Sequence, residues 1–474
     1  MPEHILIGRT DERLQLIDYL SSDRPEMIVV YGRRRVGKTF FINQVVGERA
    51  CFSFTGMENS RMQDQLLNFS ISLRKVYSAA TRTTSWLMAF DQLADYIECL
   101  PEGPKIIIFD ELPWLDTPRA QFLSAFEHFW NSWASTRNDV KLIVCGSATS
   151  WMINKLLNNR GGLHNRVTHQ IYIAPFVLSE TKQYLAHHGF RYSDKEIAEC
   201  YMIMGGIPYY YSLLSSEMSL AQNIDRLFFA AHGQLRYEFD NVYNSLFKHA
   251  KDYVLIIKTL AQRAQGLSRR QLLEITKLNN NSKFTLMLDE LEKCGFVRTY
   301  LPFGNSKRDV LYQLVDAFSL FHLKFSEANH YQDTDFWTHS LNSGLYRAWS
   351  GYAFEMLCLN HLEQIKQALG IAQIQCRACS WVSRGSEGKR GAQIDLLIDR
   401  ADQTVNVCEM KFSRVAYTIT KSDDENFENK LDKLLTETRT RKSLMLTLIT
   451  SFGLTDSKYN GHIQRTLSIA DLMR

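Results

Sequence analysis

A glycine-rich segment of the chain carries residue types that can bind the phosphates of a nucleotide. The segment reads "YGRRRVGKTFFI" and matches the pattern GxxxxGK[ST] with Gly32, Gly37, Lys38 and Thr39. Glycines at these positions let backbone N–H groups converge on phosphate oxygens, the lysine adds a positive charge, and the threonine hydroxyl can complete the shell of a Mg²⁺ ion. The spacing therefore predicts a phosphate-binding loop that holds a nucleotide with Mg²⁺.

Polar residues at the ends of two apolar segments can complete this chemistry. "KIIIFDELPWL" delivers Asp110 and Glu111 at the carboxyl end of a predicted strand, and "KLIVCGSATSWM" delivers Ser147 in the same way. We expect Asp110 to hold Mg²⁺ through its waters and Glu111 to orient or deprotonate the attacking water. The Ser147 hydroxyl could touch the γ-phosphate or that water. Each residue alone is also typical of a buried strand that ends in a polar side chain.

A strand and a helix must position the loop, and the flanking segments fit these elements. "EMIVVYG" is a short apolar, β-branched run that ends at a glycine, as a buried parallel strand does. "KTFFINQVV" places Phe40, Phe41 and Val45 at helical spacing. The alternative is a chance match in an ordinary basic turn, which the strand–turn–helix context disfavours. We interpret the three arginines of residues 33–35 as charges on the loop surface that can contact a partner.

A second group of ionisable residues, near the C-terminus, has the spacing of a metal-dependent nuclease. "GAQIDLLIDR" predicts a strand with Asp395, and "TVNVCEMKFSR" predicts another with Glu409 and Lys411 on one face. The two carboxylates can bind Mg²⁺ or Mn²⁺. Lys411 would position or activate a water and balance the charge on the scissile phosphate. Glu355, on a predicted helix before these strands, would assist the metal site.

The spacing Asp–x13–Glu–x–Lys is the PD-(D/E)xK nuclease signature, which is short and degenerate. Ile394 stands where many nucleases have proline. The predicted order of elements, a helix, three strands, a helix and a strand, favours the nuclease-like fold. Two alternatives stay open: an ion pair of Glu409 and Lys411 on an edge strand, and an inactive module of the same fold that binds a partner.

Between these regions, three short amphipathic helices and a hairpin predict a winged helix-turn-helix. The helices are expected in "DYVLIIKTLAQ", "SRRQLLEIT" and "NNSKFTLMLDELEKCG", and "FVRTYLPFGNSKRDVLYQLVD" alternates around a Gly-Asn turn. Residues 248–309 hold 12 Lys or Arg against 6 Asp or Glu, which favours DNA as the partner of this module. The alternative is a regulatory arm that only packs on the nucleotide-binding domain.

The candidate DNA contacts of this module form two groups. The start of the third helix carries side chains able to reach base edges or phosphates: Asn279, Asn280, Asn281 and Lys283. Four further cations could hold backbone phosphates: Arg269, Arg270, Lys307 and Arg308. The sequence therefore predicts a DNA-binding surface on this module.

Length and composition exclude several classes of protein. A chain of 474 residues, 45% hydrophobic and 22% charged, is long enough for several domains and has the balance of an ordinary globular protein. No apolar segment reaches the ~18 residues of a membrane span, and no secretory signal pattern is visible. Nine scattered cysteines indicate reduced thiols and a cytoplasmic location. Cys376 and Cys379 have metal-ligand spacing, but no second pair accompanies them to complete a zinc site.

Several segments occur in an order that resembles the archaeal-type P-loop ATPase family of the AAA+/STAND branch. They are "ILIGRTDERLQLIDYL", the phosphate loop, "FDELPWL", "CGSATSWM", "NNRGGLHNRVTHQIYIAPF" and "MGGIPYYY", and they span residues 1 to about 245. The resemblance implies that Gly8 and Arg9 lie near the adenine, and that Pro208 closes over the base from a helical lid. It makes Arg166 the candidate γ-phosphate-sensing arginine, with Arg160 as the alternative. The resemblance also implies a C-terminal nuclease-like domain, which is frequent in this family.

The sequence thus predicts an α/β protein with a P-loop parallel-sheet core, a helical lid, a winged helix-turn-helix and a restriction-endonuclease-like domain. The expected boundaries are 1–175 for the ATPase core, 176–245 for the lid, 246–316 for the winged helix, 317–345 for a connector and 346–474 for the nuclease-like domain. We expect a Mg²⁺-dependent ATPase that acts on DNA and not on membranes. The alternative is a STAND-type signalling ATPase whose C-terminal domain is an inactive partner-binding module. A homo-oligomer formed through the ATPase domain is compatible with both.

Overall fold

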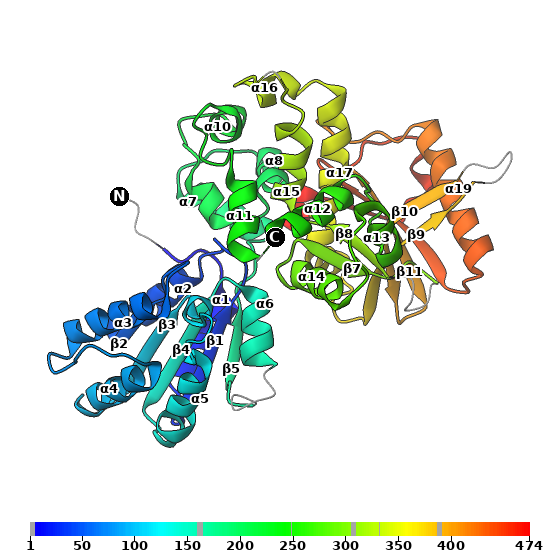
Figure 1. The fold of residues 1–474 in the computed structure, drawn as a ribbon. Coiled ribbons are helices and arrows are strands. Elements are labelled where there is room, and N and C mark those ends of the chain that lie inside the picture. The colour runs from blue at the N-terminus through cyan, green and yellow to red at the C-terminus, as the bar shows by residue number, and fades with distance from the viewer. Residues whose placement is uncertain (1–4, 159–164, 248, 305–309, 331, 386–390) are drawn as a thin grey trace. The chain divides into compact units, whose positions relative to one another are not determined.

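The computed structural model describes residues 5–158, 165–247, 249–304, 310–330, 332–385 and 391–474. The chain divides into two compact units, residues 1–175 and residues 176–474 (Figure 1). Both units combine helices with strands, so the protein is of the α/β class that we predicted. In the part of the chain that is described, no helix is both long enough and apolar enough to cross a membrane.

The first unit is built on a five-stranded parallel sheet in the order β2-β3-β4-β1-β5. Its strands are β1 (Glu26–Tyr31), β2 (Ala50–Thr55), β3 (Lys105–Asp110), β4 (Val140–Gly146) and β5 (His169–Tyr172). Strands β1, β3 and β4 are buried almost throughout, as near-continuous apolar runs in a parallel sheet should be. Because the strands are parallel, their carboxyl ends lie at the same edge.

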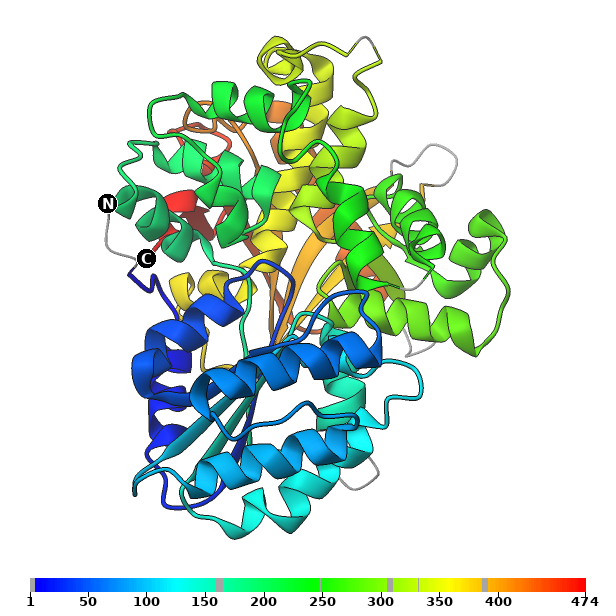
Figure 2. The same ribbon diagram turned by 60° about the vertical axis from the view of Figure 1, so that its left-hand side comes forward.

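Helices cover this sheet (Figure 2). They bury a cluster of aromatic rings against it. The helices are α1 (Thr10–Leu20), α2 (Lys38–Val46), α3 (Met62–Val76), α4 (Trp86–Glu98), α5 (Phe122–Ser132) and α6 (Thr149–Trp151). The ring centroids of Phe69 on α3, Phe90 on α4 and Phe109 on β3 lie 5.9 to 6.5 Å apart. This packing fixes β3 from one side and hence the acidic residues at its end.

The second unit begins with a helical region. It contains α7 (Leu178–His187), α8 (Asp194–Met204), α9 (Pro208–Ser212), α10 (Leu220–Ile224) and α11 (Glu238–Leu246). The segment that we expected to connect two domains forms α15 (Ala317–Phe321) and α16 (Phe336–Ser340), and both pack here. The Phe318 ring lies 4.9 Å from that of Tyr210, and Asp225 accepts a hydrogen bond from the backbone of Trp337 at 2.8 Å. This segment therefore contributes to the core of the helical region.

Three helices and a small antiparallel sheet follow the helical region. The helices are α12 (Ala250–Ala261), α13 (Arg269–Thr276) and α14 (Ser282–Lys293), and the strands are β6 (Leu267–Ser268), β7 (Val297–Tyr300) and β8 (Leu311–Leu314), in the order β6-β8-β7. Side-chain caps begin two of the helices: Ser268 accepts from the N–H of Gln271, and Asn281 accepts from the N–H of Phe284. The turn expected between β7 and β8 lies outside the described residues.

The C-terminal region contains a second five-stranded sheet, in the order β13-β12-β11-β10-β9. The strands are β9 (Cys376–Ser383), β10 (Ala392–Arg400), β11 (Thr404–Lys411), β12 (Ser443–Thr450) and β13 (Arg465–Ser468). The helices are α17 (Gly344–Asn360), α18 (Leu362–Ala368), α19 (Lys421–Thr438) and α20 (Ile469–Leu472). Strands β9, β10 and β11 are antiparallel, whereas β11, β12 and β13 are parallel. The sequence pattern did not predict the short elements α18, β13 and α20.

Candidate functional site

The phosphate-type loop connects β1 to the N-terminus of α2. Gly37 is the N-cap of α2 with φ 89°, and Gly32 has φ 153°. A Cβ atom at position 32 would lie 2.3 Å from the carbonyl oxygen of Ile173, so glycine is required there. The ammonium of Lys38 donates to the carbonyl oxygens of Gly32 and Arg33, each at 3.0 Å. The loop thus wraps around a buried positive charge at a helix N-terminus, which is a favourable place for an anion.

The interpretation of residues 33–35 as surface charges is wrong for Arg33. That residue is 6% exposed, while Arg34 and Arg35 are half-buried. The physical reason is the curvature of the loop: the backbone carbonyl of Arg33 turns toward Lys38 and accepts a hydrogen bond from its ammonium at 3.0 Å. From the sequence alone we expected an arginine between two loop glycines to be exposed, because no local residue pattern indicates that the loop folds back on itself.

Asp110, at the carboxyl end of β3, meets the first turn of α2. Its carboxylate accepts a hydrogen bond from the Thr39 hydroxyl at 2.8 Å and another from the backbone N–H of Glu111 at 2.9 Å. Hydroxyl and carboxylate oxygens are the hard ligands that Mg²⁺ prefers. Thr39 and Asp110 therefore form a donor set that fits Mg²⁺ beside the loop.

Glu111 and Ser147 also come together at this edge of the sheet. The Glu111 carboxylate accepts hydrogen bonds from the backbone N–H of Ser147 at 3.1 Å and from its hydroxyl at 2.9 Å. Burial raises the pKa of Glu111 above its ordinary value, while the charge of Lys38 and the two Ser147 bonds oppose that rise. Glu111 has φ 47°, a left-handed backbone conformation directly after the end of β3. Sequence reasoning found both residues but not the bonds between them.

Comparison with known proteins gives a family match for this part of the chain. Residues 7–214 match the model of a family described as an ATPase domain predominantly from Archaea. The match supports a P-loop ATPase in this part of the chain. This match covers less than half of the chain, so it describes the N-terminal part alone.

Whole-chain similarities are more distant. An uncharacterized protein of Methanocaldococcus jannaschii, MJECL04, is 25% identical over 390 residues, which are 81% of this chain and 83% of that protein. The Walker-type ATPase PABY2304 of Pyrococcus abyssi is 18% identical with a TM-score of 0.49, covering 67% of this chain and 96% of that one. The Aeropyrum pernix ORC2 protein is 14% identical with a TM-score of 0.42, covering 72% and 97%. At these scores the two structures support no conclusion beyond the family match.

The residues expected around the adenine lie in both units. Within the first unit, Gly8 has φ 63° and Arg9 is 5% exposed, and the Arg9 guanidinium donates to the carbonyl oxygen of Ala174. Pro208 begins α9 in the second unit. Gly206, two residues earlier, donates its N–H to the Tyr211 hydroxyl at 3.1 Å. These bonds give Arg9 and the GGIP segment structural roles, and their contact with the adenine stays a prediction.

The arginine expected to sense the γ-phosphate is exposed in the turn before β5. Among the described residues, no hydrogen bond or ion pair joins Arg166 to Lys38, Thr39 or Glu111. The alternative, Arg160, lies outside the described residues. The ATPase domain thus brings together six of the predicted residues at one edge of the sheet. The described bonds do not connect Arg166 to this group. The six are Gly32, Gly37, Lys38, Thr39, Asp110 and Glu111, and Ser147 joins them through Glu111.

Several of the predicted DNA contacts already have partners within the module. The ammonium of Lys283 pairs with Asp252 at 2.8 Å, and Asn280 accepts from Arg269 at 2.9 Å. The side chain of Asn281 caps α14. Asn279 and Arg270 are exposed, while Lys307 and Arg308 lie outside the described residues. Asn279 and Arg270 are therefore the exposed part of this predicted surface, and Arg270 also pairs with Glu274 at 3.5 Å.

The predicted nuclease residues gather on α17, β10 and β11. Glu355 has its pKa raised to about 8, first by burial and then by the negative charges of Asp395 and Glu409. Lys411 and Lys430 oppose that rise. The mutual influence of three carboxylates means that these residues, distant in sequence, share one acidic centre. We call Glu355, Asp395, Glu409 and Lys411 the acidic centre below.

Sequence reasoning missed Lys430, which contacts this centre from α19. Its ammonium forms an ion pair with Glu409, and the two side chains are 12% and 7% exposed. A signal was present in the sequence: Lys430 stands between Phe427 and Leu434, which are buried on the same helix face. A lysine at an apolar position of an amphipathic helix indicates a buried partner.

The carboxylates of the acidic centre are suitable ligands for a divalent cation, but Glu409 is already paired with Lys430. Carboxylate oxygens suit Mg²⁺ or Mn²⁺, and Asp395 accepts a hydrogen bond from Gln393 at 2.5 Å. In the described part of the chain, no group of three or more His, Cys, Asp or Glu is placed to hold a metal ion. A cation bound by Asp395 and Glu409 would therefore have to replace Lys430 as the partner of Glu409.

Proposed function

We propose that this protein is a Mg²⁺-dependent ATP-hydrolysing switch that acts on DNA. The observation that carries the ATPase part is the joint position of the Thr39–Asp110 and Glu111–Ser147 pairs beside the phosphate loop. Mg²⁺ would supply charge neutralisation on the β- and γ-phosphates. Lys38 would bind the same phosphates, and Thr39 and Asp110 would hold the ion. Glu111 would accept a proton from the attacking water while the water oxygen bonds to the γ-phosphorus and the bond from that phosphorus to the β,γ-bridging oxygen breaks.

Ser147 positions Glu111 for that step. With two hydrogen bonds from one residue, the Glu111 carboxylate has a fixed direction, and the same bonds favour its ionised form. An ionised carboxylate is the form that can accept a proton. ATP turnover is accordingly expected to depend on both residues.

The module of α12–α14 and β6–β8 is the proposed DNA-reading part. Its three helices and antiparallel sheet support the winged helix-turn-helix interpretation, and its sequence is strongly basic. Exposed residues before α14, among them Asn279, would contact duplex DNA. The acidic centre of the C-terminal region would then hydrolyse the phosphodiester backbone: a water oxygen bonds to phosphorus while one phosphorus–oxygen ester bond breaks.

A second candidate function is a signalling ATPase whose C-terminal region binds a partner without catalysis. The Glu409–Lys430 pair favours it, because it neutralises one of the two expected metal ligands. Under this alternative the fold is retained and the acidic centre is structural.

Binding of double-stranded DNA tests the proposed function. The full chain is titrated into a fluorescein-labelled 30-base-pair duplex between 50 and 200 mM KCl, with and without ATP and Mg²⁺. We expect a dissociation constant that rises steeply with salt, because each phosphate contact releases counterions. No binding at 50 mM KCl under either condition would refute an action on DNA.

A further inference from the structure

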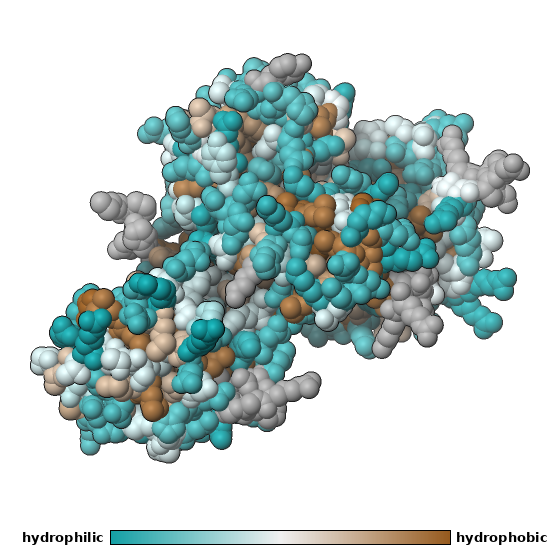
Figure 3. Space-filling view, in the orientation of Figure 1, coloured by the Kyte–Doolittle hydropathy of each residue, from teal (hydrophilic) through white to brown (hydrophobic). Residues whose placement is uncertain are grey.

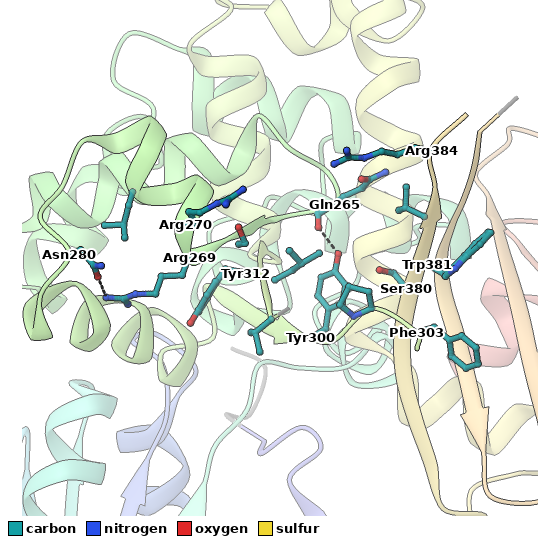
Figure 4. Close-up of a pocket in the computed structure, with 16 residues that line it drawn as sticks. Gln265, Arg269, Arg270, Asn280, Tyr300, Phe303, Tyr312, Ser380, Trp381 and Arg384 are labelled. Atoms are coloured by element: carbon teal, nitrogen blue, oxygen red, sulfur yellow. Dashed lines mark hydrogen bonds between the residues drawn. The ribbon is translucent and has the colours of Figure 1, made fainter. Parts of the chain in front are cut away.

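An open groove of about 1040 Å³ lies within the second unit, between the three-stranded sheet and the edge strand β9 (Figure 4). Its walls come from the start of α13, from β8 and the end of β7, and from the last residues of β9. Pockets for single small molecules measure ~300–1,000 Å³. The groove stands above this range and is open, so it suits a chain of linked units better than one small ligand.

Three arginines line the groove, and no Asp or Glu occurs among the described residues that line it. Arg269 and Arg270 begin α13, and Arg384 follows β9 on the other wall, as Figure 4 shows. The ion pair of Arg270 with Glu274 is 3.5 Å long and solvent-exposed, so an anion can replace it readily. A guanidinium presents its N–H donors in a planar fork that matches phosphate oxygens. The lining therefore favours a polyanion.

Aromatic side chains lie between these charges. Tyr312 on β8 and Phe303 after β7 are half-buried, whereas Tyr300 is buried and donates its hydroxyl to the backbone of Gln265 at 2.5 Å. Hydrophobic residues also gather over the region of β8 in the surface view (Figure 3). Ring faces beside arginines can stack unpaired bases, whereas the bases of a duplex are already stacked on one another. The lining therefore favours a single strand over a duplex.

Hydrogen bonds link the lining of the groove to the acidic centre. Gln265, which lines it, donates to the side-chain carbonyl of Gln393 at 2.5 Å, and Gln393 donates to the Asp395 carboxylate at 2.5 Å. Two hydrogen bonds thus separate the lining of the groove from a residue of the proposed nuclease centre. A strand lying in the groove would contact Gln265, the first amide of this chain.

We propose that the groove binds single-stranded DNA beside the acidic centre, with phosphates on Arg270 and Arg384 and bases against Tyr312. This inference rests on the proposed action on DNA and names the form of DNA that the C-terminal region takes. It predicts a binding surface separate from the duplex-reading residues before α14. Loss of one surface should leave binding at the other intact.

The test measures binding of 5′-fluorescein-labelled (dT)15 to the full chain by fluorescence anisotropy in a KCl series. The variants are Arg270→Ala/Arg384→Ala and Tyr312→Leu. The matched control is Arg191→Ala/Arg465→Ala, which removes two exposed arginines of the same unit that lie outside the groove. Each variant is also titrated with the 30-base-pair duplex, and its fold is checked by its circular dichroism spectrum and melting temperature.

We expect the arginine double variant to bind (dT)15 about tenfold more weakly or worse, with the control unchanged. Its plot of log K against log salt should be shallower by about 1.4, since each single-strand phosphate contributes about 0.7 to the slope. Tyr312→Leu should weaken (dT)15 about fivefold with the slope unchanged, because it removes stacking and no charge. Duplex binding should be the same in all variants.

Three results would overturn the inference. If duplex binds and (dT)15 binding is equal in groove and control variants, the groove is not the single-strand site, although the proposed function stands. If a poly-glutamate peptide displaces (dT)15 at equal concentration of charge, the groove is an acidic-polymer site. If neither duplex nor (dT)15 binds, the inference fails together with the proposed function.

Discussion

The hydroxyl of Ser147 donates a hydrogen bond to the Glu111 carboxylate at 2.9 Å, and the backbone N–H of Ser147 donates a second at 3.1 Å. The two residues follow neighbouring parallel strands, β3 and β4, whose carboxyl ends lie side by side. One residue therefore fixes the direction of the carboxylate that is proposed to activate water in the ATPase domain.

Replacing this carboxylate by an amide should separate nucleotide binding from turnover. Glu111→Gln keeps the size of the side chain but cannot accept a proton, so we expect ATP binding within about twofold of the wild type and a kcat about 10²- to 10⁴-fold lower. Lys38→Ala should instead lose ATP binding, because it removes the buried charge from the loop. Isothermal titration and a phosphate-release assay measure the two quantities. Unchanged turnover in Glu111→Gln would remove Glu111 from the mechanism.

The Ser147 bonds predict a defined change in pH dependence. Burial raises the pKa of Glu111, and hydrogen bonds from Ser147 lower it, so Ser147→Ala should raise this pKa further. A base with a higher pKa ionises at higher pH, and the acidic limb of the kcat profile should move to higher pH. The plateau at high pH should recover most of the wild-type rate. A uniform loss of rate at every pH, with the limb in place, would mean that Ser147 acts on the phosphate or on the water directly.

Loss of Lys430 should make the protein sensitive to divalent cations. Lys430→Met leaves Glu409 as an uncompensated buried charge, and we expect the free energy of unfolding to fall by about 3–5 kcal/mol in EDTA. Mn²⁺ at millimolar concentration should raise the free energy of unfolding of Lys430→Met by more than it raises that of the wild type. The control is Lys421→Met on the same helix, whose pair with Glu425 is exposed and contributes only ~0–1 kcal/mol. Equal responses of both variants to Mn²⁺ would contradict a cation site at Glu409.

Glu355 should make stability depend on pH. Its pKa is raised from the ordinary value of 4.5 to about 8 by burial and by the charges of Asp395 and Glu409. The folded protein therefore holds this proton more tightly than the unfolded chain, and the resulting stability is fully present below pH 4.5 and lost as the pH rises through 8. Urea denaturation in EDTA should show Glu355→Gln to be less dependent on pH over this window than the wild type. Parallel pH curves for both proteins would show that Glu355 does not titrate in this way.

The first unit could be predicted from its sequence because Asp110, Glu111 and Ser147 stand at the ends of apolar strands. A parallel sheet then brings Asp110 and Ser147 to one edge, whatever the length of the chain between them. The inward position of Arg33 could not be predicted, since it depends on how the loop folds back. The Glu111–Ser147 bonds likewise depend on the left-handed backbone of Glu111, which no residue pattern encodes.

The acidic centre could be predicted only as a set of carboxylates. Alternation along β11 placed Glu409 beside Lys411, but the partner of Glu409 is Lys430, on a helix whose packing against the sheet is a tertiary effect. Asn281 is a similar case: we predicted a contact with DNA, and its side chain caps α14. In both cases a polar side chain that we assigned to a ligand forms a bond within the protein.

Metal-dependent cleavage of DNA tests the central claim most directly. Linear, circular and single-stranded DNA are incubated with the full chain in Mg²⁺ or Mn²⁺, with and without ATP, beside Asp395→Ala and a control, Asp432→Ala, that removes an exposed carboxylate of α19. We predict cleavage that ATP changes, that Asp395→Ala abolishes and that Asp432→Ala retains. Intact DNA in every reaction, with a folded protein that binds ATP, would contradict the account and favour the signalling ATPase.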